Sequence, residues 1–504
     1  MTRPTPPIEL GGPPAGIRGR IPTSPATVDR AVLDAIAATG AEVDDGDEAR
    51  TEASRDWWPL AMRWALQGKV PALAAAVVRP ATVTQVAGVL AACRAAMVPV
   101  TVAGGRSGVC GASVPLFGGV VLDMGAMAGV RDVDAHSLVV DVHAGTFGPD
   151  LERALRSDHG ITIGHWPQSM DLSTVGGWLA CRGAGQYSTR YGKIEDIVAG
   201  LEVVLADGTV VHTGAFAPRA ATGPDLTQLF VGSEGTLGVI TAARLRARPV
   251  PAAERRSAWA FTRFADGIEA CRRVLRRGAT PAVLRLYDPV ESERNFTQGD
   301  TNLLLVLDEG DPELVGATMR VVDDECAASG GAHADPGLVA RWLEHRNDVS
   351  ALAPLVRAGI VVDTIEVAAS WRALPELFGD ALRRLRGLEG MLAASAHQSH
   401  AYADGACLYF TFGGQPPATT GDADAWAEQF TVAAWDAVMA ATIARGGAIS
   451  HHHGIGIARA RYMDGAPGVA NDVLACVKEA LDPVGILNPG KMGLASAFGE
   501  VPWP

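Results

Sequence analysis

The chain has 504 residues, of which 48% are hydrophobic and 20% are charged. This composition is typical of a soluble globular protein, and the length favours two or more domains. The formal net charge of −13 at pH 7 argues against nucleic acid or an anionic membrane as the main partner, because both repel an acidic surface.

The cysteines and the N-terminal sequence indicate a cytoplasmic protein. The seven cysteines are scattered and form no Cys-x-x-Cys pair, which favours reduced thiols over a disulfide or zinc framework. Residues 1–7 begin no apolar run of the kind that signal peptides carry. No stretch of about 18 apolar residues is present, so we expect no transmembrane segment. Peripheral contact with a membrane is left open.

The first half of the chain divides into an N-terminal segment, residues 1–75, and a region of alternating elements, residues 76–250. Residues 1–27 are rich in Pro and Gly and are expected to be irregular, whereas the spacing of Val32, Leu33 and Ile36 predicts a helix. In the second region a helix is predicted at 83–96. Strands are predicted at 75–78, 98–102, 120–122, 138–142, 202–205 and 210–212, with a hairpin turn at 206–209.

The second half is expected to form a domain of residues 251–445 and a C-terminal segment, 446–504, that returns to the first domain. Helices are predicted at 267–276, 375–386 and 425–445, and strands at 283–287, 302–307 and 407–412. Long amphipathic helices mixed with strands indicate an α+β domain built on an antiparallel sheet.

Three glycine-rich turns, at residues 102–108, 173–178 and 232–240, predict a large cofactor that carries phosphate. Glycine lets backbone N–H groups approach a ligand closely, so such turns can hold a pyrophosphate without cationic side chains. None of them continues as a Walker A loop, and none opens a helix as Gly-x-Gly-x-x-Gly does. A single turn of this kind is better explained by a need for positive φ, but three together favour the cofactor.

With two further motifs, at 191–198 and 481–491, the turns make residues 76–492 resemble the FAD-binding flavoproteins of the vanillyl-alcohol oxidase type. Segments 165–177, 402–410 and 450–456 resemble one branch of them, alkyldihydroxyacetonephosphate synthase, a flavoenzyme of ether-lipid synthesis. The resemblance implies an α+β fold. Its parts are a two-part FAD-binding domain of the PCMH type and an α+β cap domain with an antiparallel sheet.

The resemblance implies that backbone amides of four segments bind FAD. Relatives with covalently bound flavin often have histidine after the Gly-Gly of the first turn, where this chain has Arg106, and nothing marks Cys110 as an attacking thiolate. We therefore expect non-covalent FAD. The implied cofactor-binding residues are Thr101, Val102, Ala103, Gly104, Gly105, Arg106, Ser107, Gln168, Ser169, Met170, Asp171, Leu172, Ser173, Thr174, Cys181, Arg182, Gly183, Ala184, Glu234, Gly235, Thr236, Leu237, Gly238, Val239 and Ile240.

The consecutive residues His451, His452 and His453 invite a metal site, but we expect none. Adjacent side chains point to opposite faces of a strand, or about 100° apart on a helix, so three neighbouring imidazoles rarely share one ion. The metal-dependent 2-hydroxyacid dehydrogenases of the same superfamily have ligands at positions that match Tyr402, Tyr409, His452 and His453. Only His453 is retained. The alternative for the triplet is one buried histidine and two solvated ones.

Tyr409 and the three histidines are the implied proton-transfer groups. In the synthase the matching tyrosine is the proposed proton donor or acceptor. The unperturbed pKa of tyrosine is about 10, so we expect imidazoles or guanidinium groups nearby to lower the pKa of Tyr409 if it acts as a base.

Arg285 and Arg357 match two arginines of the synthase active site. A buried arginine requires a counter-charge, which the phosphate or carboxylate of a substrate would supply by bidentate contact. The alternative for each arginine is a structural salt bridge to an acidic residue of the chain, namely Asp288, Asp363 or Glu366.

Two enzyme functions follow from these expectations. The first resembles alkyldihydroxyacetonephosphate synthase: a substrate carbon adds to flavin N5, and an acyl chain is exchanged for a fatty alcohol without net redox change. The alternative is an FAD-dependent oxidoreductase of a small alcohol or 2-hydroxy acid, with hydride passing to N5. A non-enzymatic flavin- or lipid-binding protein is disfavoured by the intact set of polar catalytic groups. The expected partner is a small anionic or lipid-like substrate, and we expect a homodimer.

Overall fold

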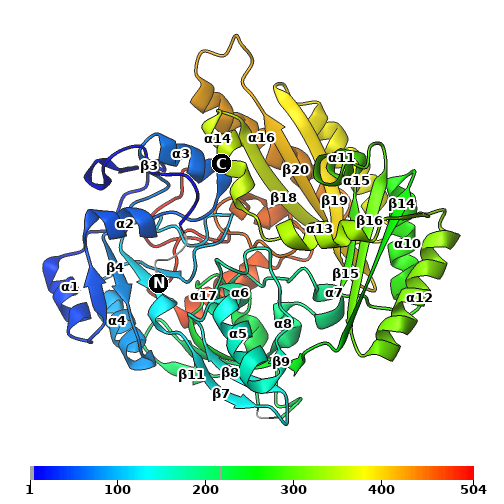
Figure 1. The fold of residues 1–504 in the computed structure, drawn as a ribbon. Helices are drawn as coiled ribbons and strands as arrows, with labels where there is room; N and C mark the ends of the chain where they lie inside the picture. Colours follow the sequence, from blue (N-terminus) through cyan, green and yellow to red (C-terminus); the bar gives the residue numbers. More distant parts are fainter. Residues whose placement is uncertain (1–4, 216, 504) are drawn as a thin grey trace.

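The structure is a computed structural model that describes residues 5–215 and 217–503. Its first layer is a four-stranded sheet in the order β2 (Glu42–Asp44), β4 (Ala76–Arg79), β6 (Val120–Asp123) and β5 (Val100–Ala103). β4, β6 and β5 are parallel, because helix α4 (Val83–Ala95) carries the chain from β4 back to the start of β5. Helix α1 (Arg30–Ala37) packs beside α4 (Figure 1). Strand β2 joins this sheet, so residues before 76 contribute to it.

The second layer is a five-stranded antiparallel sheet. Its strands, in spatial order, are β11 (Val210–His212), β10 (Val198–Val204), β12 (Val239–Arg246), β8 (Val139–His143) and β7 (Val130–Asp134). The helices α5 (Gly148–His159), α6 (Val175–Ala180) and α8 (Ile194–Ile197) bury their apolar residues against it. The two sheets together confirm the predicted two-part domain.

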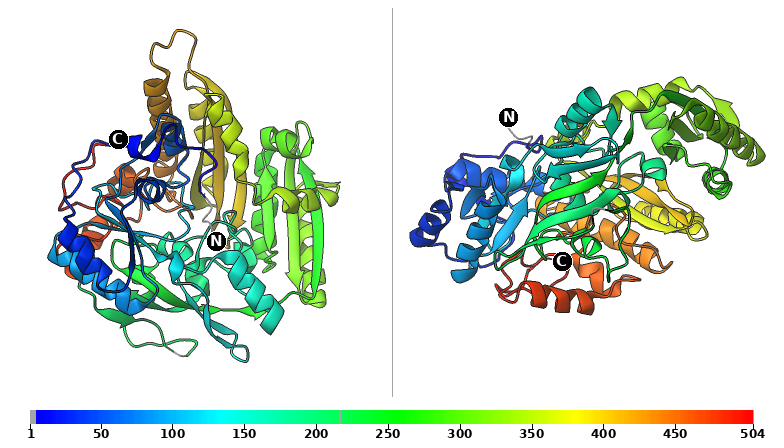
Figure 2. Two further views of the ribbon diagram at one scale, coloured as in Figure 1. Left: turned by 60° about the vertical axis from the view of Figure 1, so that its left-hand side comes forward. Right: turned by 90° about the horizontal axis from the view of Figure 1, so that it is seen from below.

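The third layer is the cap, a seven-stranded antiparallel sheet that stands to the right in the left view of Figure 2. Its strands, in spatial order, are β17 (Ala332–Ala334), β14 (Ala253–Phe261), β16 (Asn302–Gly310), β15 (Val283–Tyr287), β19 (Met391–Ala401), β20 (Gly405–Gly414) and β18 (Val361–Ser370). Its outer face is covered by α10 (Phe264–Arg276), α12 (Pro312–Ala328), α15 (Leu374–Arg386) and α16 (Ala423–Ile443). The predicted antiparallel α+β cap is confirmed.

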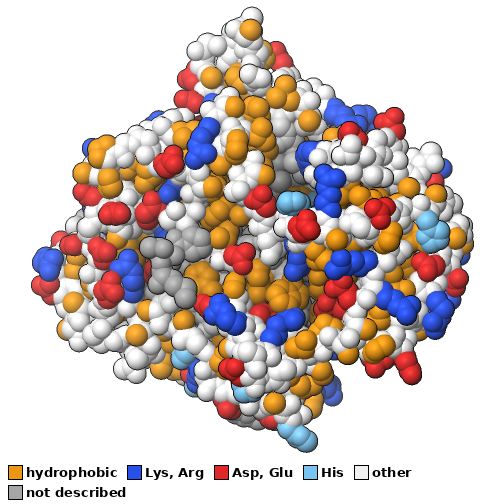
Figure 3. Space-filling view, in the orientation of Figure 1, with side chains coloured by type: hydrophobic (Ala, Val, Ile, Leu, Met, Phe, Trp, Pro, Cys, Tyr) orange, Lys and Arg blue, Asp and Glu red, His pale blue; other side chains and the backbone are white. Residues whose placement is uncertain are grey.

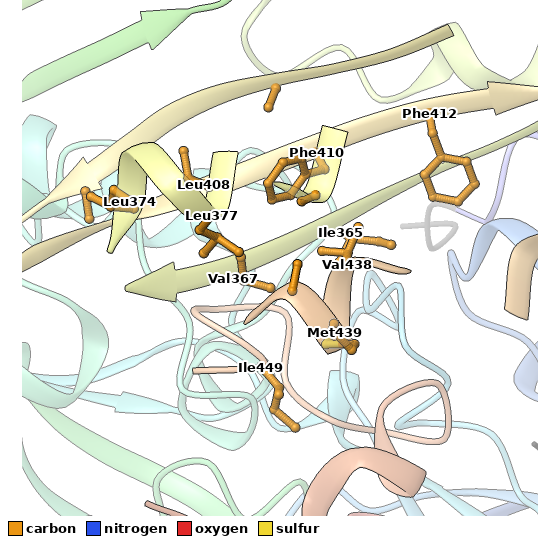
Figure 4. Close-up of a cluster of buried hydrophobic side chains, with 14 of the residues drawn as sticks. Ile365, Val367, Leu374, Leu377, Leu408, Phe410, Phe412, Val438, Met439 and Ile449 are labelled. Atoms are coloured by element: carbon orange, nitrogen blue, oxygen red, sulfur yellow. The ribbon is translucent and has the colours of Figure 1, made fainter. Parts of the chain in front are cut away.

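Strand β20 shows how the cap sheet separates its core from the functional face. Leu408, Phe410 and Phe412 point to one side and pack under α15 and α16, as Figure 4 shows. Because side chains alternate along a strand, Tyr409 and Thr411 point to the other side. Burying each of the large apolar side chains contributes about 1.5–3 kcal/mol. The hydrophobic packing of β20 therefore fixes the direction in which Tyr409 faces.

The C-terminal end of the described chain packs beside helix α3 (Pro59–Leu66). Trp503 makes edge contacts with Trp58 and Trp64, at ring-centroid distances of 5.6 and 5.3 Å. The C-terminal segment also returns to the first sheet, where the N–H of Asn488 donates to the carbonyl of Val100. No helix in residues 5–215 or 217–503 has the length and hydrophobicity needed to cross a membrane.

Candidate active site

A cavity of about 840 Å³ lies between the cap sheet and the glycine turns. Figure 3 shows hydrophobic surface gathered in a hollow near the middle of this face. The predicted cofactor residues that line the cavity are Val102, Gly104, Gly105, Arg106, Ser107, Gln168, Ser169, Leu172, Ser173, Thr174, Cys181, Gly183, Ala184, Glu234, Gly235, Gly238 and Ile240. The remaining ones, which do not line it, are Thr101, Ala103, Met170, Asp171, Arg182, Thr236, Leu237 and Val239.

The first two glycine turns pack directly against each other. A Cβ atom at Gly105 would collide with the carbonyl oxygen of Leu172, and one at Gly104 would collide with the hydroxyl of Thr174. Only glycine therefore fits at these positions, and the turns present backbone to the cavity. This is the wall that an extended phosphate-bearing ligand requires.

A buried histidine beside these turns also fits a bound cofactor. Neither ring nitrogen of His165 has a hydrogen-bond partner in the described structure, although the ring lines the cavity. Burial lowers the pKa of His165 to about 3, so the imidazole is neutral. An unpaired buried polar group costs about 1–3 kcal/mol, and the polar groups of FAD would remove that cost.

The surroundings of the first turn agree with the expectation of non-covalent FAD. Arg106 has a φ of 56° and donates to the backbone carbonyl of Glu52. Burial raises the pKa of the Cys110 thiol well above its ordinary value, and it raises the pKa of Cys181 to about 12. Neither thiol is therefore an activated nucleophile. Non-covalent binding stays a prediction.

On the cap side, four strands place four functional side chains in one row. Tyr287 on β15 is paired with His397 on β19, His397 with Tyr409 on β20, and Tyr409 with Glu366 on β18. Residues directly opposite on antiparallel strands point to the same face. The rings of His397 and Tyr409 accordingly stack, with centroids 4.9 Å apart.

The hydroxyl of Tyr409 is a proton donor in this setting. It lines the cavity and donates to the Thr364 hydroxyl at 3.0 Å. Burial raises the pKa of Tyr409 well above its ordinary value of 10, and the hydrogen bond with Thr364 and the charge of Arg285 do not offset it. The expectation that neighbouring groups lower this pKa is therefore wrong, because burial disfavours the phenolate more than the cation stabilises it.

Glu366 organises the three histidines. Its carboxylate accepts hydrogen bonds from the backbone N–H groups of His451 and His453, the latter at 2.9 Å. It also accepts 3.0 Å and 2.6 Å hydrogen bonds from the Ser450 hydroxyl and from the guanidinium of Arg459, which is fully buried. A carboxylate with so many donors holds the loop of residues 450–453 against the cap sheet.

The three imidazoles lie close together instead of diverging. Nδ1 of His451 lies 3.0 Å from Nδ1 of His452, and the rings of His452 and His453 are 4.5 Å apart. The expectation that adjacent histidines point apart is wrong here, because this segment is neither helix nor strand. His452 and His453 line the cavity, whereas the ring of His451 packs against His400 and Tyr402.

Burial keeps these imidazoles neutral. It lowers the pKa of His451 and of His453 to about 4, and that of His452 well below its ordinary value of 6.5. The carboxylate of Glu366 remains charged: burial raises the pKa of Glu366, but the charge of Arg459 is the largest opposing effect, and the pKa stays far below its ordinary value. Neutral imidazoles at neutral pH are ready to accept a proton.

The same loop contains a group of potential metal ligands. Ligand atoms of Glu366, Cys407, His451 and His452 lie within 4.8 Å of one another. Both oxygens of Glu366 already accept hydrogen bonds, one of them from Arg459. A positively charged guanidinium on the same carboxylate disfavours a cation there. The expectation of a metal-free site stays a prediction.

Arg285 faces the cavity without an acidic partner. Among the described residues no carboxylate oxygen lies within 4.0 Å of its guanidinium, and Nη2 instead contacts Nε2 of His397 at 2.7 Å. The acids weighed as salt-bridge partners are engaged elsewhere. Asp288 caps α11 (Pro289–Phe296), Asp363 accepts from Trp435, and Glu366 pairs with Arg459. The salt-bridge alternative for Arg285 is therefore wrong.

Arg357 does not reach the cavity. It is the last residue of α14 (Ala353–Arg357), its side chain is 45% exposed, and it donates to the carbonyl of Pro7 at 3.0 Å. Arg346, just after α13 (Gly337–His345), lines the cavity instead. Its guanidinium carbon lies 5.0–5.8 Å from the ring centroids of three aromatic residues, Trp166, Tyr187 and Trp342.

A glycine-walled cavity closed by an antiparallel cap defines a flavin-dependent enzyme. Residues 74–214 match the family model of the FAD binding domain, and residues 250–492 match that of the FAD linked oxidases, C-terminal domain. The chain belongs to the family of FAD-linked oxidoreductases, and its cofactor is FAD.

Two relatives and one solved structure place the chain within that family. It is 31% identical to the uncharacterized FAD-linked oxidoreductase YgcU of Escherichia coli O157:H7, over 74% of this chain and 78% of that protein. It is 30% identical to alkyldihydroxyacetonephosphate synthase of Dictyostelium discoideum, over 77% and 68% of the two chains. A crystal structure of alkyldihydroxyacetonephosphate synthase has the same fold, with a TM-score of 0.76, 24% identity, and coverage of 93% and 87%.

Proposed function

We propose that the protein is an FAD-dependent oxidoreductase that oxidises a small alcohol carrying an anionic group, such as a 2-hydroxy acid. The observation that carries this proposal is Arg285, a cation that faces the cavity with no carboxylate within 4.0 Å in the described structure. It lies on the same sheet face as Tyr409. Bound FAD would supply the acceptor for a hydride.

Different residues of the cap would bind the anionic group of the substrate and accept its proton. Arg285, assisted by Arg346, would hold the anionic group of the substrate. His452 or His453, both neutral, would accept the proton of the alcohol. Tyr409, which keeps its proton, would donate a hydrogen bond to the substrate oxygen. The cap would exclude water from the site.

A second candidate is the exchange reaction of alkyldihydroxyacetonephosphate synthase. It is favoured by the shared Tyr409, Arg285 and triple histidine, and by apolar side chains that line the cavity, namely Trp57, Met62, Val109, Leu352 and Leu355. It is disfavoured by the position of Arg357, which the synthase motif places in the active site and this structure places on the surface.

Anaerobic mixing separates the two candidates. The holoenzyme is mixed without oxygen with glycolate, lactate, 2-hydroxyglutarate and glycerol 3-phosphate, with uncharged glycerol as a control. Lasting loss of the visible flavin band with one of the anions, and none with glycerol, supports the oxidoreductase. A flavin that stays oxidised with all of them, together with turnover of an acyl dihydroxyacetone phosphate and a fatty alcohol, refutes it in favour of the exchange reaction.

A further inference from the structure

A buried carboxylate under the cap sheet has no role in the function proposed above. Glu291 lies in the first turn of α11 and is 1% exposed. Its Oε2 lies 2.7 Å from Nδ1 of His397, and its Oε1 accepts from the hydroxyls of Ser395 and Thr411, both at 3.2 Å. These contacts orient the carboxylate toward His397.

The contacts of His397 determine which ring nitrogen carries the proton. Nε2 lies 2.7 Å from Nη2 of Arg285, and a guanidinium has only donors, so Nε2 must accept. Nδ1 therefore carries the proton and donates a hydrogen bond to Glu291. Burial, followed by the charge of Arg285, lowers the pKa of His397 to about 4, in agreement with a neutral ring.

This arrangement separates the charge of Glu291 from that of Arg285. Burial raises the pKa of Glu291, but the hydrogen bond from His397 and the charge of Arg294 bring it below its ordinary value, so the carboxylate is ionised. Its direct cationic partner is Arg294, whose Nη2 lies 3.3 Å from Oε1. Arg285 contacts only the uncharged ring of His397 on this side. Its Nε is buried without a hydrogen-bond partner in the described structure.

We propose that Glu291 and His397 are positioning residues that fix the guanidinium of Arg285 while leaving its charge available to the anionic group of the substrate. A carboxylate in direct contact would fix Arg285 equally well, but it would neutralise the cation. A neutral acceptor held in one tautomer provides the orientation alone. The inference rests on the proposed function, because it supposes an anionic substrate.

Calorimetric titration of the oxidised holoenzyme with oxalate, and separately with inorganic phosphate, tests the proposal without turnover. Glu291→Leu removes the acceptor of the His397 proton, and His397→Leu removes the acceptor of Arg285. Each is expected to weaken oxalate binding roughly ten- to a hundredfold. His397→Gln offers Arg285 a neutral acceptor again and should bind within about threefold of wild type. Ser395→Ala is the matched control, because it removes a hydroxyl that donates to Glu291 and leaves the contacts of His397 with Glu291 and Arg285 in place.

Kinetics and a reference variant distinguish a positioning role from general damage. With a substrate that reduces the flavin, the two leucine variants should raise KM and change kcat little, while FAD content stays at the wild-type value. Arg285→Met should abolish anion binding. If either leucine variant fails to fold, His397→Gln and Glu291→Gln are compared in its place. Glu291→Gln keeps an oxygen acceptor for His397, and both glutamine variants should bind the anion as wild type does.

The two ways of failing are distinct. If the wild-type holoenzyme binds neither oxalate nor phosphate, the proposed anionic substrate is wrong, and this inference falls with it. If wild type binds the anion and Arg285→Met does not, but Glu291→Leu and His397→Leu bind as wild type, only the positioning role of Glu291 and His397 is refuted.

Discussion

On the FAD-binding side of the cavity the wall is made of backbone, whereas on the cap side it is made of side chains. At Gly105 the backbone of Leu172 leaves no room for a Cβ atom, and at Gly104 the side chain of Thr174 leaves none. On the cap, Tyr287, His397 and Tyr409 face the cavity because three strands are paired in one register. The first wall depends on local conformation, and the second depends on pairing between distant segments.

This difference determines how each wall responds to mutation. A backbone wall tolerates no added atom, but it needs no particular side-chain chemistry. A side-chain wall tolerates changes of shape, but each polar group is held by another, as Glu366 holds the histidine loop and Glu291 holds His397. The following predictions test this contrast.

The largest effect is expected for Gly105→Ala. The new Cβ would meet the carbonyl of Leu172, so the first two turns must separate and FAD should be lost almost completely from the purified protein. Gly108→Ala is the matched control in the same turn, because the nearest atom to its Cβ is a carboxylate oxygen of Asp56 at 3.8 Å. Flavin absorbance per protein measures both. Normal flavin content in Gly105→Ala would contradict the backbone-wall account.

Glu366→Gln should be the most destabilising change on the cap side. It leaves the fully buried Arg459 without a counter-charge, which costs about 3–5 kcal/mol of unfolding free energy. Glu42→Gln removes the partner of Arg79 in an exposed pair and should cost less than about 1 kcal/mol. Urea unfolding, monitored by the release of flavin, compares the unfolding free energies of the two variants. Equal losses would show that Glu366 does not anchor the loop.

The pH profile should reflect the lowered pKa values of the histidines. A base with an ordinary pKa of about 6.5 would lose about tenfold in rate at pH 5.5. His453, with a pKa of about 4, stays neutral there, so kcat/KM should be nearly flat from pH 7.5 to 5.5 and fall only as the pH approaches 4. Brief pH jumps in a stopped-flow instrument measure this. A decline centred on pH 6.5 would exclude the buried histidines as the base.

The smallest effects are expected from cofactor and metal tests. EDTA should leave activity unchanged, because the carboxylate of the only described ligand cluster is occupied by Arg459. Acid precipitation should release FAD into the supernatant, because burial keeps the nearby thiols protonated. Activity lost on chelation and restored by zinc, or yellow colour that remains in the pellet, would contradict the respective prediction.

The FAD side was predictable from sequence because its signal is local. Each glycine turn lies within a few residues, and the first one directly follows the strand predicted at 98–102. Strand β12 was not predicted, but the turn that precedes it was. The motif order along the chain was enough to imply FAD.

The cap side was predictable only in part. Tyr409 was found through its motif, but its raised pKa depends on burial, which sequence does not display. Strand β19 was not predicted, because His397, Gln398 and His400 interrupt any apolar pattern, and with it the partners of Tyr409 and Arg285 were missed. Arg346, Glu291 and the anchoring role of Glu366 were missed because their significance arises from contacts between segments far apart in the sequence.

The most direct test of the account is anaerobic reduction of the flavin by an accepted substrate, compared in wild type and Tyr409→Phe. The substitution removes one hydroxyl at the centre of the cap row and leaves both FAD turns unchanged, so flavin content should stay normal. If this hydroxyl stabilises the reacting oxygen, the single-turnover rate constant should fall by about 10²–10⁴. A rate constant near that of wild type, with flavin fully bound, would contradict the assignment of the chemistry to this row of side chains.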